Sequence, residues 1–119
     1  MHDLQLSLIV PSIRPHNWER FCSCVEQSFS GSFEVIFVGP HASPPDNLNR
    51  FNIKCIQDFG SPVWCAQRGT CQASGFYTFL SSDDVFFYPH AIDRVFTIFD
   101  QYKCDYKFIV TGKYYEGDN

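Results

Sequence analysis

The sequence has no cluster of positive charge and no long apolar run, and each absence excludes a class of function. Its nine Lys and Arg residues are scattered singly along 119 residues, and the formal net charge is −4. Nucleic-acid binding relies on basic patches that neutralise phosphates, so we expect no nucleic-acid partner. A transmembrane helix needs about 20 consecutive apolar residues. No stretch reaches that length, and we expect no transmembrane segment.

Metal-binding cysteine spacing is also missing. The six cysteines form no Cys-x-x-Cys pair and no paired Cys/His pattern, which argues against a zinc site. The N-terminal residues 1–3 carry no basic region of the kind that opens a signal peptide. We therefore expect free, mostly buried thiols and a cytoplasmic protein.

Apolar and aromatic residues are abundant, at 45% and 18% of the chain, and they suffice for one core. Their periodicity predicts strands that alternate with helices. We expect strands over residues 4–10, 33–38, 51–57, 76–80 and 106–111, with helices that begin after Asn17, at Pro62 and at Pro89. This order predicts a single α/β domain over residues 1–119, with a Rossmann-like, open, mostly parallel sheet and helices on both faces.

Capping residues predict the limits of the helices. Asn17 is a candidate N-cap for the first helix. Ser61 and Pro62 are typical of a helix start, and we expect this second helix to run to residue 74 with Gly75 as its C′ residue. Gly69 inside it costs about 1 kcal/mol relative to alanine. It therefore indicates a close approach to the sheet or to a ligand.

Two adjacent acids follow the predicted strand 76–80, which we expect to be covered on both faces. Asp83 and Asp84 then lie at the carboxyl edge of a parallel sheet, where such sheets bind ligands. Neighbouring carboxylates repel one another, and a divalent cation such as Mg²⁺ or Mn²⁺ relieves that repulsion. The alternative is a solvated turn in which an Asp caps the next helix.

The order of these motifs resembles the N-terminal, nucleotide-binding half of a family 2 glycosyltransferase with the A-type, nucleotide-diphospho-sugar transferase fold. The resemblance covers most of the chain and rests on residues 8–12 (LIVPS), 22–28, 34–38 (EVIFV), 60–62 (GSP), 67–69 (QRG), 73–77 and 81–84 (SSDD). It implies a hexosyltransferase-type enzyme that passes a sugar from a nucleotide-diphosphate donor to an acceptor of unknown identity.

The resemblance also implies roles for individual residues. Pro11, Ser12 and Arg14 would line the nucleotide pocket, with Asp58 beside the base or ribose. Arg68 would approach the diphosphate, and Ser82 would belong to the donor site. Asp83, assisted by Asp84, would hold Mn²⁺ or Mg²⁺, which neutralises charge on the leaving diphosphate.

The sequence departs from the family pattern at several positions. Gly39 and Pro40 stand where the family often has an acid pair, Ser81 replaces the first acid of the metal motif, and Ala66 replaces an arginine. The family's general base and acceptor region lie beyond residue 119, so no catalytic base is assigned. We expect either a donor-binding fragment of a longer enzyme or a short member.

Two other interpretations remain. A non-catalytic nucleotide- or protein-binding module derived from the same fold would lack turnover, and an exposed sheet edge would favour a homodimer. A receiver-like domain also gathers acids at strand ends, but here the first strand ends in Pro11 and Ser12 instead of acids.

Overall fold

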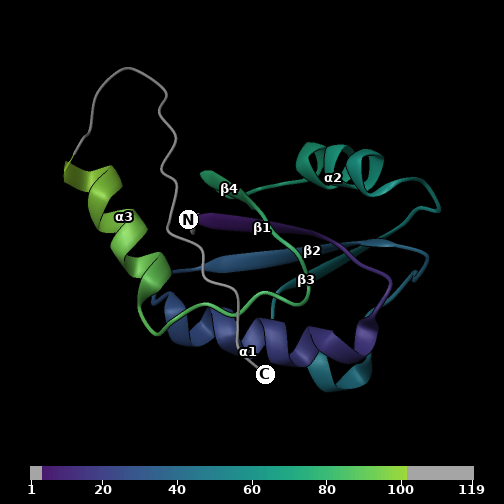
Figure 1. Ribbon diagram of the computed structural model, residues 1–119, viewed down its shortest axis with the longest axis horizontal. Helices are drawn as coiled ribbons and strands as arrows, with labels where there is room; N and C mark the ends of the chain where they lie inside the picture. The colour runs from purple at the N-terminus through teal and green to yellow at the C-terminus, as the bar shows by residue number, and fades with distance from the viewer. Residues whose placement is uncertain (1–3, 102–119) are drawn as a thin grey trace.

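The chain forms an all-parallel, four-stranded sheet with helices on both faces in a computed structural model that describes residues 4–101 (Figure 1). The strands are β1 (Leu6–Pro11), β2 (Phe33–Gly39), β3 (Ile53–Gln57) and β4 (Tyr77–Leu80), in the order β3-β2-β1-β4. The helices are α1 (Trp18–Ser28), α2 (Pro62–Cys71) and α3 (Ala91–Gln101), with short 3₁₀ turns η1 (Pro15–Asn17) and η2 (Asp46–Leu48). The predicted α/β, Rossmann-like class is confirmed. The predicted strand over residues 106–111 lies outside the described residues.

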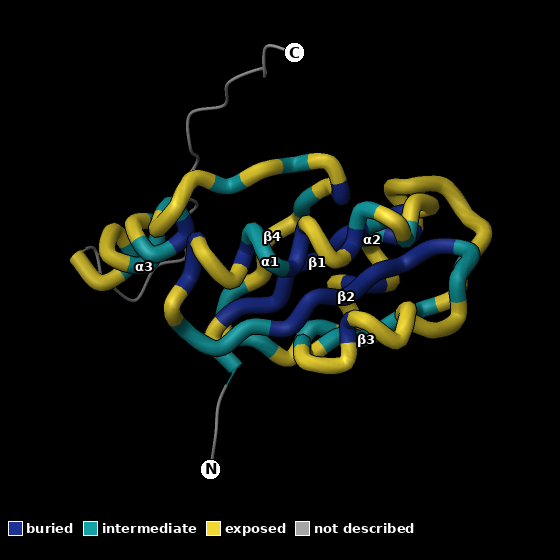
Figure 2. Tube along the Cα trace, turned by 90° about the horizontal axis from the view of Figure 1, so that it is seen from below, coloured by how far each residue is buried: buried dark blue, intermediate teal, exposed yellow. Residues whose placement is uncertain are grey.

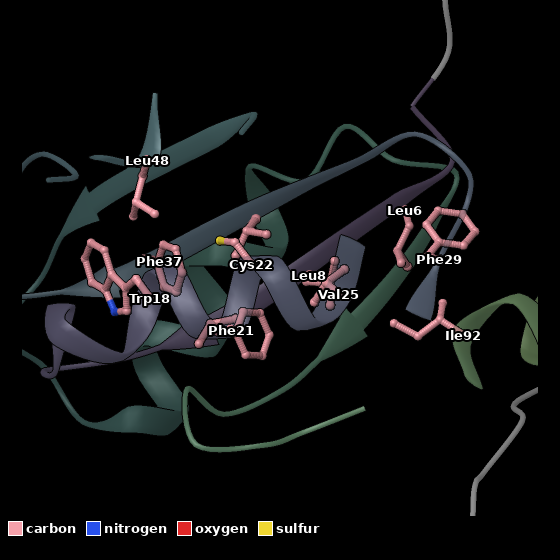
Figure 3. Close-up of a cluster of buried hydrophobic side chains, with 12 residues drawn as sticks. Leu6, Leu8, Trp18, Phe21, Cys22, Val25, Phe29, Phe37, Leu48 and Ile92 are labelled. Carbon is pink, nitrogen blue, oxygen red and sulfur yellow. The ribbon is translucent and has the colours of Figure 1, made fainter. Parts of the chain in front are cut away.

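Helix α1 covers one face of the sheet through the apolar stripe that its sequence predicts. Figure 3 shows this stripe against β1 and β2, with Trp18 beside Phe37. The two rings are stacked with centroids 4.0 Å apart. Ile92 of α3 extends the same cluster, whose buried members are Leu6, Leu8, Val10, Trp18, Phe21, Cys22, Val25, Phe29, Val35, Phe37, Leu48 and Ile92. Each large side chain removed from water here contributes about 1.5–3 kcal/mol.

Helix α2 covers the opposite face of the sheet (Figure 1), and it approaches the sheet closely at Gly69. A Cβ at this position would lie 2.6 Å from Ile9 Cγ2 and 3.0 Å from Val38 Cγ2. The predicted close approach of Gly69 is therefore to the sheet. Ser61 caps the helix as expected, because its hydroxyl accepts from the Trp64 amide at 3.2 Å.

We expect Gly69→Ala to destabilise the protein by about 1–3 kcal/mol, as overpacked cores do, although alanine is the better helix former. The methyl group would force α2 away from Ile9 and Val38. Urea denaturation measures the change, with Gln67→Ala on the exposed side of the same helix as the control. Gln67→Ala should stay within about 0.5 kcal/mol of the parent protein, as most surface substitutions do. A stability gain for Gly69→Ala would contradict the close packing.

Strand β4 is an edge strand of the described sheet, and the expectation that it is covered on both faces is wrong. It pairs with β1 alone among the described strands. Figure 2 shows long buried stretches along β1 and β2, whereas three of the four residues of β4 are exposed. Phe79 is 38% exposed and Leu80 58% exposed. Apolar composition predicted the strand correctly, but it carries no information about which neighbour lies beside it.

One predicted helix limit is confirmed and one is wrong. Asn17 is the N-cap residue of α1, as predicted, although its side chain makes no capping hydrogen bond. Helix α2 ends at Cys71, so Gly75 is not its C′ residue. A Cβ at Gly75 would lie 2.6 Å from the Leu6 carbonyl carbon, so glycine is needed there for the approach to β1.

A buried polar network ties the start of β4 to the sheet. Glu34 of β2 is fully buried, and its carboxylate accepts hydrogen bonds from the Ser7 hydroxyl at 2.6 Å and the Ser74 amide at 2.7 Å. Lys54 Nζ lies 3.1 Å from the other carboxylate oxygen. Burial alone would raise the pKa of Glu34, but these partners outweigh it and lower the pKa. The network holds the segment that leads into β4.

The five cysteines within residues 4–101 are free thiols. Burial raises the pKa of Cys22 to about 12 and that of Cys55 to about 11, so these two are protonated and unreactive at neutral pH. Cys65 is buried as expected, whereas Cys71 is exposed and the expectation of a core position is wrong there. No helix in this part of the chain combines the length and apolarity needed to cross a membrane.

Candidate functional site

The loops that follow all four strands meet at one edge of the sheet. Because the strands are parallel, their carboxyl ends share that edge, and a pocket of about 500 Å³ opens there. Residues 11–14, 38–40 and 58–60 line it, together with Pro62 and Cys65 of α2 and Asp83. The structure thus brings five predicted site residues to one pocket: Pro11, Ser12, Arg14, Asp58 and Asp83.

Gly39 allows the loops after β1 and β3 to converge at the end of β2. A Cβ on Gly39 would collide with the backbone carbonyl oxygen of Ser12. The Ser12 amide donates to the Val38 carbonyl at 3.0 Å, and the Asp58 amide donates to the Gly39 carbonyl at 2.7 Å. Gly39 therefore has a steric role, because it permits the loop after β1 to pack against β2.

Asp83 points inward and is only 2% exposed. One carboxylate oxygen accepts from the Ser12 hydroxyl and from Arg14 Nε at 3.3 Å, and the other accepts from Arg14 Nη2. This carboxylate ties the loop after β4 to the loop after β1. Both of its oxygens are engaged by the protein, so in this arrangement Asp83 positions Arg14 and presents no oxygen toward a cation.

Ser12 is the centre of the hydrogen-bond network at the floor of the pocket. Its hydroxyl donates to Asp83 and accepts from Trp18 Nε1 at 2.8 Å and from the Arg14 amide at 3.1 Å. Trp18 therefore has a second role besides its packing against Phe37, and this role was not identified from the sequence. The available signal was chemical, since a buried indole N–H almost always finds an acceptor.

Arg14 places positive charge at the pocket. Its side chain is 46% exposed, and its guanidinium lies 3.8 Å from Asp84 as well as against Asp83. The hydrogen bond and charge of Asp83 raise the pKa of Arg14 above its ordinary value. Arg14 is therefore a permanent cation, held in a defined orientation and still accessible to a ligand.

Asp84 points outward, in contrast to its neighbour. Its side chain is 57% exposed, and its carboxylate accepts a hydrogen bond from the Ser82 hydroxyl. That bond, together with the nearby Arg14 charge, lowers the pKa of Asp84, so the group is ionised at neutral pH. Ser82 thus acts on Asp84. Neither residue is among those that line the pocket, and Asp84 lies beside it, 3.8 Å from Arg14.

Metal chemistry at this site would rest on Asp84. Residues 4–101 contain no group of three His, Cys, Asp or Glu side chains that would by itself hold a metal ion. Mg²⁺ and Mn²⁺, however, bind through one or two carboxylates together with substrate phosphates. An exposed, ionised carboxylate fits that mode of binding, so the donor chemistry suits a hard divalent cation that arrives with a phosphate ligand.

Asp58 and Arg68 form a second ion pair on the far side of the pocket. Asp58 accepts from the Gly60 amide at 2.7 Å, from Trp64 Nε1 at 3.0 Å and from Arg68 Nη1 at 2.8 Å. The Gly60 amide makes the largest contribution to lowering the pKa of Asp58. Arg68, which we expected near a diphosphate, is held by Asp58 and is not among the residues that line the pocket.

Two exposed apolar side chains that the sequence did not single out also line the pocket. Ile13 is 72% exposed and Phe59 is 80% exposed. They follow β1 and β3 respectively, so they flank the end of β2. Exposed apolar groups at a pocket are typical of binding surfaces.

Comparison with known proteins leaves the site to be interpreted from its geometry. No family model matches the sequence. No curated protein matches it either.

Proposed function

We propose that the pocket binds the nucleoside diphosphate of a nucleotide-sugar donor, and that the protein is a metal-dependent glycosyltransferase of hexosyltransferase type or the donor-binding half of one. The observation that carries this proposal is that the two adjacent acids at the carboxyl edge have different environments. Asp83 is buried and orients Arg14, while Asp84 is exposed and ionised. A cation and an anionic ligand would thus find complementary groups side by side.

The charge balance at and beside the pocket favours a cation-dependent ligand. Asp58, Asp83 and Arg14 line the pocket, and Asp84 and Arg68 lie next to it as their ion-pair partners, so three carboxylates outnumber two guanidiniums. A diphosphate would meet net negative charge here, and a divalent cation such as Mn²⁺ or Mg²⁺ reverses that balance. When bound, such a metal supplies charge neutralisation for the leaving diphosphate. Arg14 would contact the phosphates directly, and Asp84 would hold the metal.

The proposal assigns no catalytic base, and the acceptor is not specified. It includes a cytoplasmic location, which the free thiols of the described residues support. The alternative of a non-catalytic, self-associating module is favoured by one observation, the apolar surface around the edge strand β4. Phe79, Leu80, Phe86 and Tyr88 are all exposed there, and such edges favour association.

Titration calorimetry with UDP and GDP, in Mn²⁺ and in EDTA, tests the donor proposal. We expect binding in Mn²⁺ and a loss of affinity of at least about tenfold in EDTA, because one charge-assisted contact accounts for 1.5–3 kcal/mol. Asp84→Asn should remove the effect of Mn²⁺. Asp46→Asn neutralises an exposed acid of η2, in the connection between β2 and β3, and serves as the matched control.

Binding that is equal in Mn²⁺ and EDTA, or a metal effect that survives Asp84→Asn, would contradict the metal-dependent proposal. Two further measurements separate the enzyme from the non-catalytic module. Sugar transfer by the purified chain excludes the module, whereas a dimer in solution without turnover supports it.

A further inference from the structure

We propose that Ile13 and Phe59 form a slot that binds the nucleobase by stacking and discriminates little between bases. This inference rests on the proposed donor function and specifies its substrate class. Phe59 is 80% exposed and Ile13 is 72% exposed, and both line the pocket from loops on either side of β2. An aromatic ring and a branched aliphatic side chain at one pocket fit a flat, apolar ligand face.

The polar side chains beside this slot are already engaged with each other. Asp58 accepts three hydrogen bonds from the protein, and both oxygens of Asp83 accept from Ser12 or Arg14. Ser12 donates its hydroxyl proton to Asp83 and accepts two further bonds. In these three residues the protein's own groups already engage both oxygens of each carboxylate and the donor and acceptor positions of the Ser12 hydroxyl, so none of them offers a wholly unused atom to a base edge.

The backbone at the end of β2 is engaged in the same way. The Gly39 carbonyl accepts from the Asp58 amide at 2.7 Å, and the Pro40 carbonyl accepts from Gln57 Nε2 at 3.0 Å. Neither residue has a polar side chain, and Pro40 has no N–H to donate. The end of β2 therefore has few free groups with which to read the hydrogen-bonding edge of a base.

These two features determine the expected selectivity. A site that hydrogen-bonds its substrate rejects analogues by 10⁴-fold or more, whereas an apolar pocket discriminates only weakly. Stacking on an aromatic side chain tolerates any base because every base has a π face. We therefore expect UDP, CDP, ADP and GDP to bind with dissociation constants within about tenfold of one another, and all more tightly than pyrophosphate.

The test is calorimetry with these four nucleotides and pyrophosphate, each in Mn²⁺, on the parent protein, Phe59→Ala and Phe76→Ala. Phe76 is 83% exposed and lies before β4 at the opposite edge of the sheet, so it is the matched control. Phe59→Ala should weaken the binding of every nucleotide by roughly 5- to 150-fold and leave pyrophosphate binding unchanged. Phe76→Ala should leave both nucleotide and pyrophosphate binding unchanged.

The outcomes separate the two proposals. A preference of more than about 100-fold for one base overturns the slot. Unchanged nucleotide binding in Phe59→Ala, as expected for Phe76→Ala, overturns it as well. Pyrophosphate binding as tightly as the nucleotides also overturns the slot, while the phosphate site stands. If neither pyrophosphate nor any nucleotide binds, the donor function itself fails.

Discussion

Asp83→Asn is expected to destabilise the protein by about 1–3 kcal/mol, the cost of leaving buried hydrogen-bonding groups unsatisfied. The carboxylate accepts from Ser12 and Arg14 with both oxygens, and it is 2% exposed. An asparagine replaces one acceptor with an NH₂ group that would face another donor. Thermal unfolding should show a decrease in Tm of at least about 4 °C, since 1 kcal/mol corresponds to roughly 4–8 °C in small domains.

The neighbouring acid is the control for this prediction. Asp84→Asn alters a side chain that is 57% exposed, so its effect on stability should stay within about 0.5 kcal/mol. The two substitutions are therefore expected to have opposite profiles, with Asp83 affecting stability and Asp84 affecting metal-dependent binding. Equal losses of stability for the two variants would contradict the inward and outward assignment.

Gly39→Ala is expected to cost about 1–3 kcal/mol of stability, as overpacking does, and to abolish the pocket. The new methyl group would meet the backbone oxygen of Ser12, which cannot rotate away as a side chain does. Separation of the two segments would break the bond that joins the Ser12 amide to the Val38 carbonyl. Urea denaturation and nucleotide titration measure the two effects.

Gly31→Ala is the matched glycine control. The added methyl group would meet side-chain atoms of Gln5 and Phe29 instead of backbone atoms. Gly31 itself precedes β2, at the edge of the sheet away from the pocket. We expect a smaller loss of stability and unchanged nucleotide binding. Retention of full nucleotide affinity by Gly39→Ala would show that the convergence of the loops is not needed for the site.

Local signals in the sequence predicted much of the fold. The apolar stripe of α1, the Ser61 cap of α2 and the short apolar strands each depend on residues that are close in the chain. Features that depend on distant neighbours were missed. Strand β4 contains apolar residues yet lies at an edge of the described sheet, and α2 ends at Cys71, before the chain turns into β4 beside β1.

The candidate site was predicted in its location but not in its contacts. The parallel order of strands implies that Ser12, Asp58 and Asp83 meet at one edge, and they do. The pairing of Arg14 with Asp83 joins residues 69 positions apart, so no local sequence pattern predicts it. For the same reason the sequence did not indicate that one acid turns inward while the other faces solvent.

A crystal structure of the protein with UDP and Mn²⁺ tests the central claim most directly. The account predicts a diphosphate beside Arg14, a metal ion bound to Asp84, and the base against Phe59. Nucleotide density away from the carboxyl edge of the sheet, or a pocket that stays empty at saturating UDP, would contradict it.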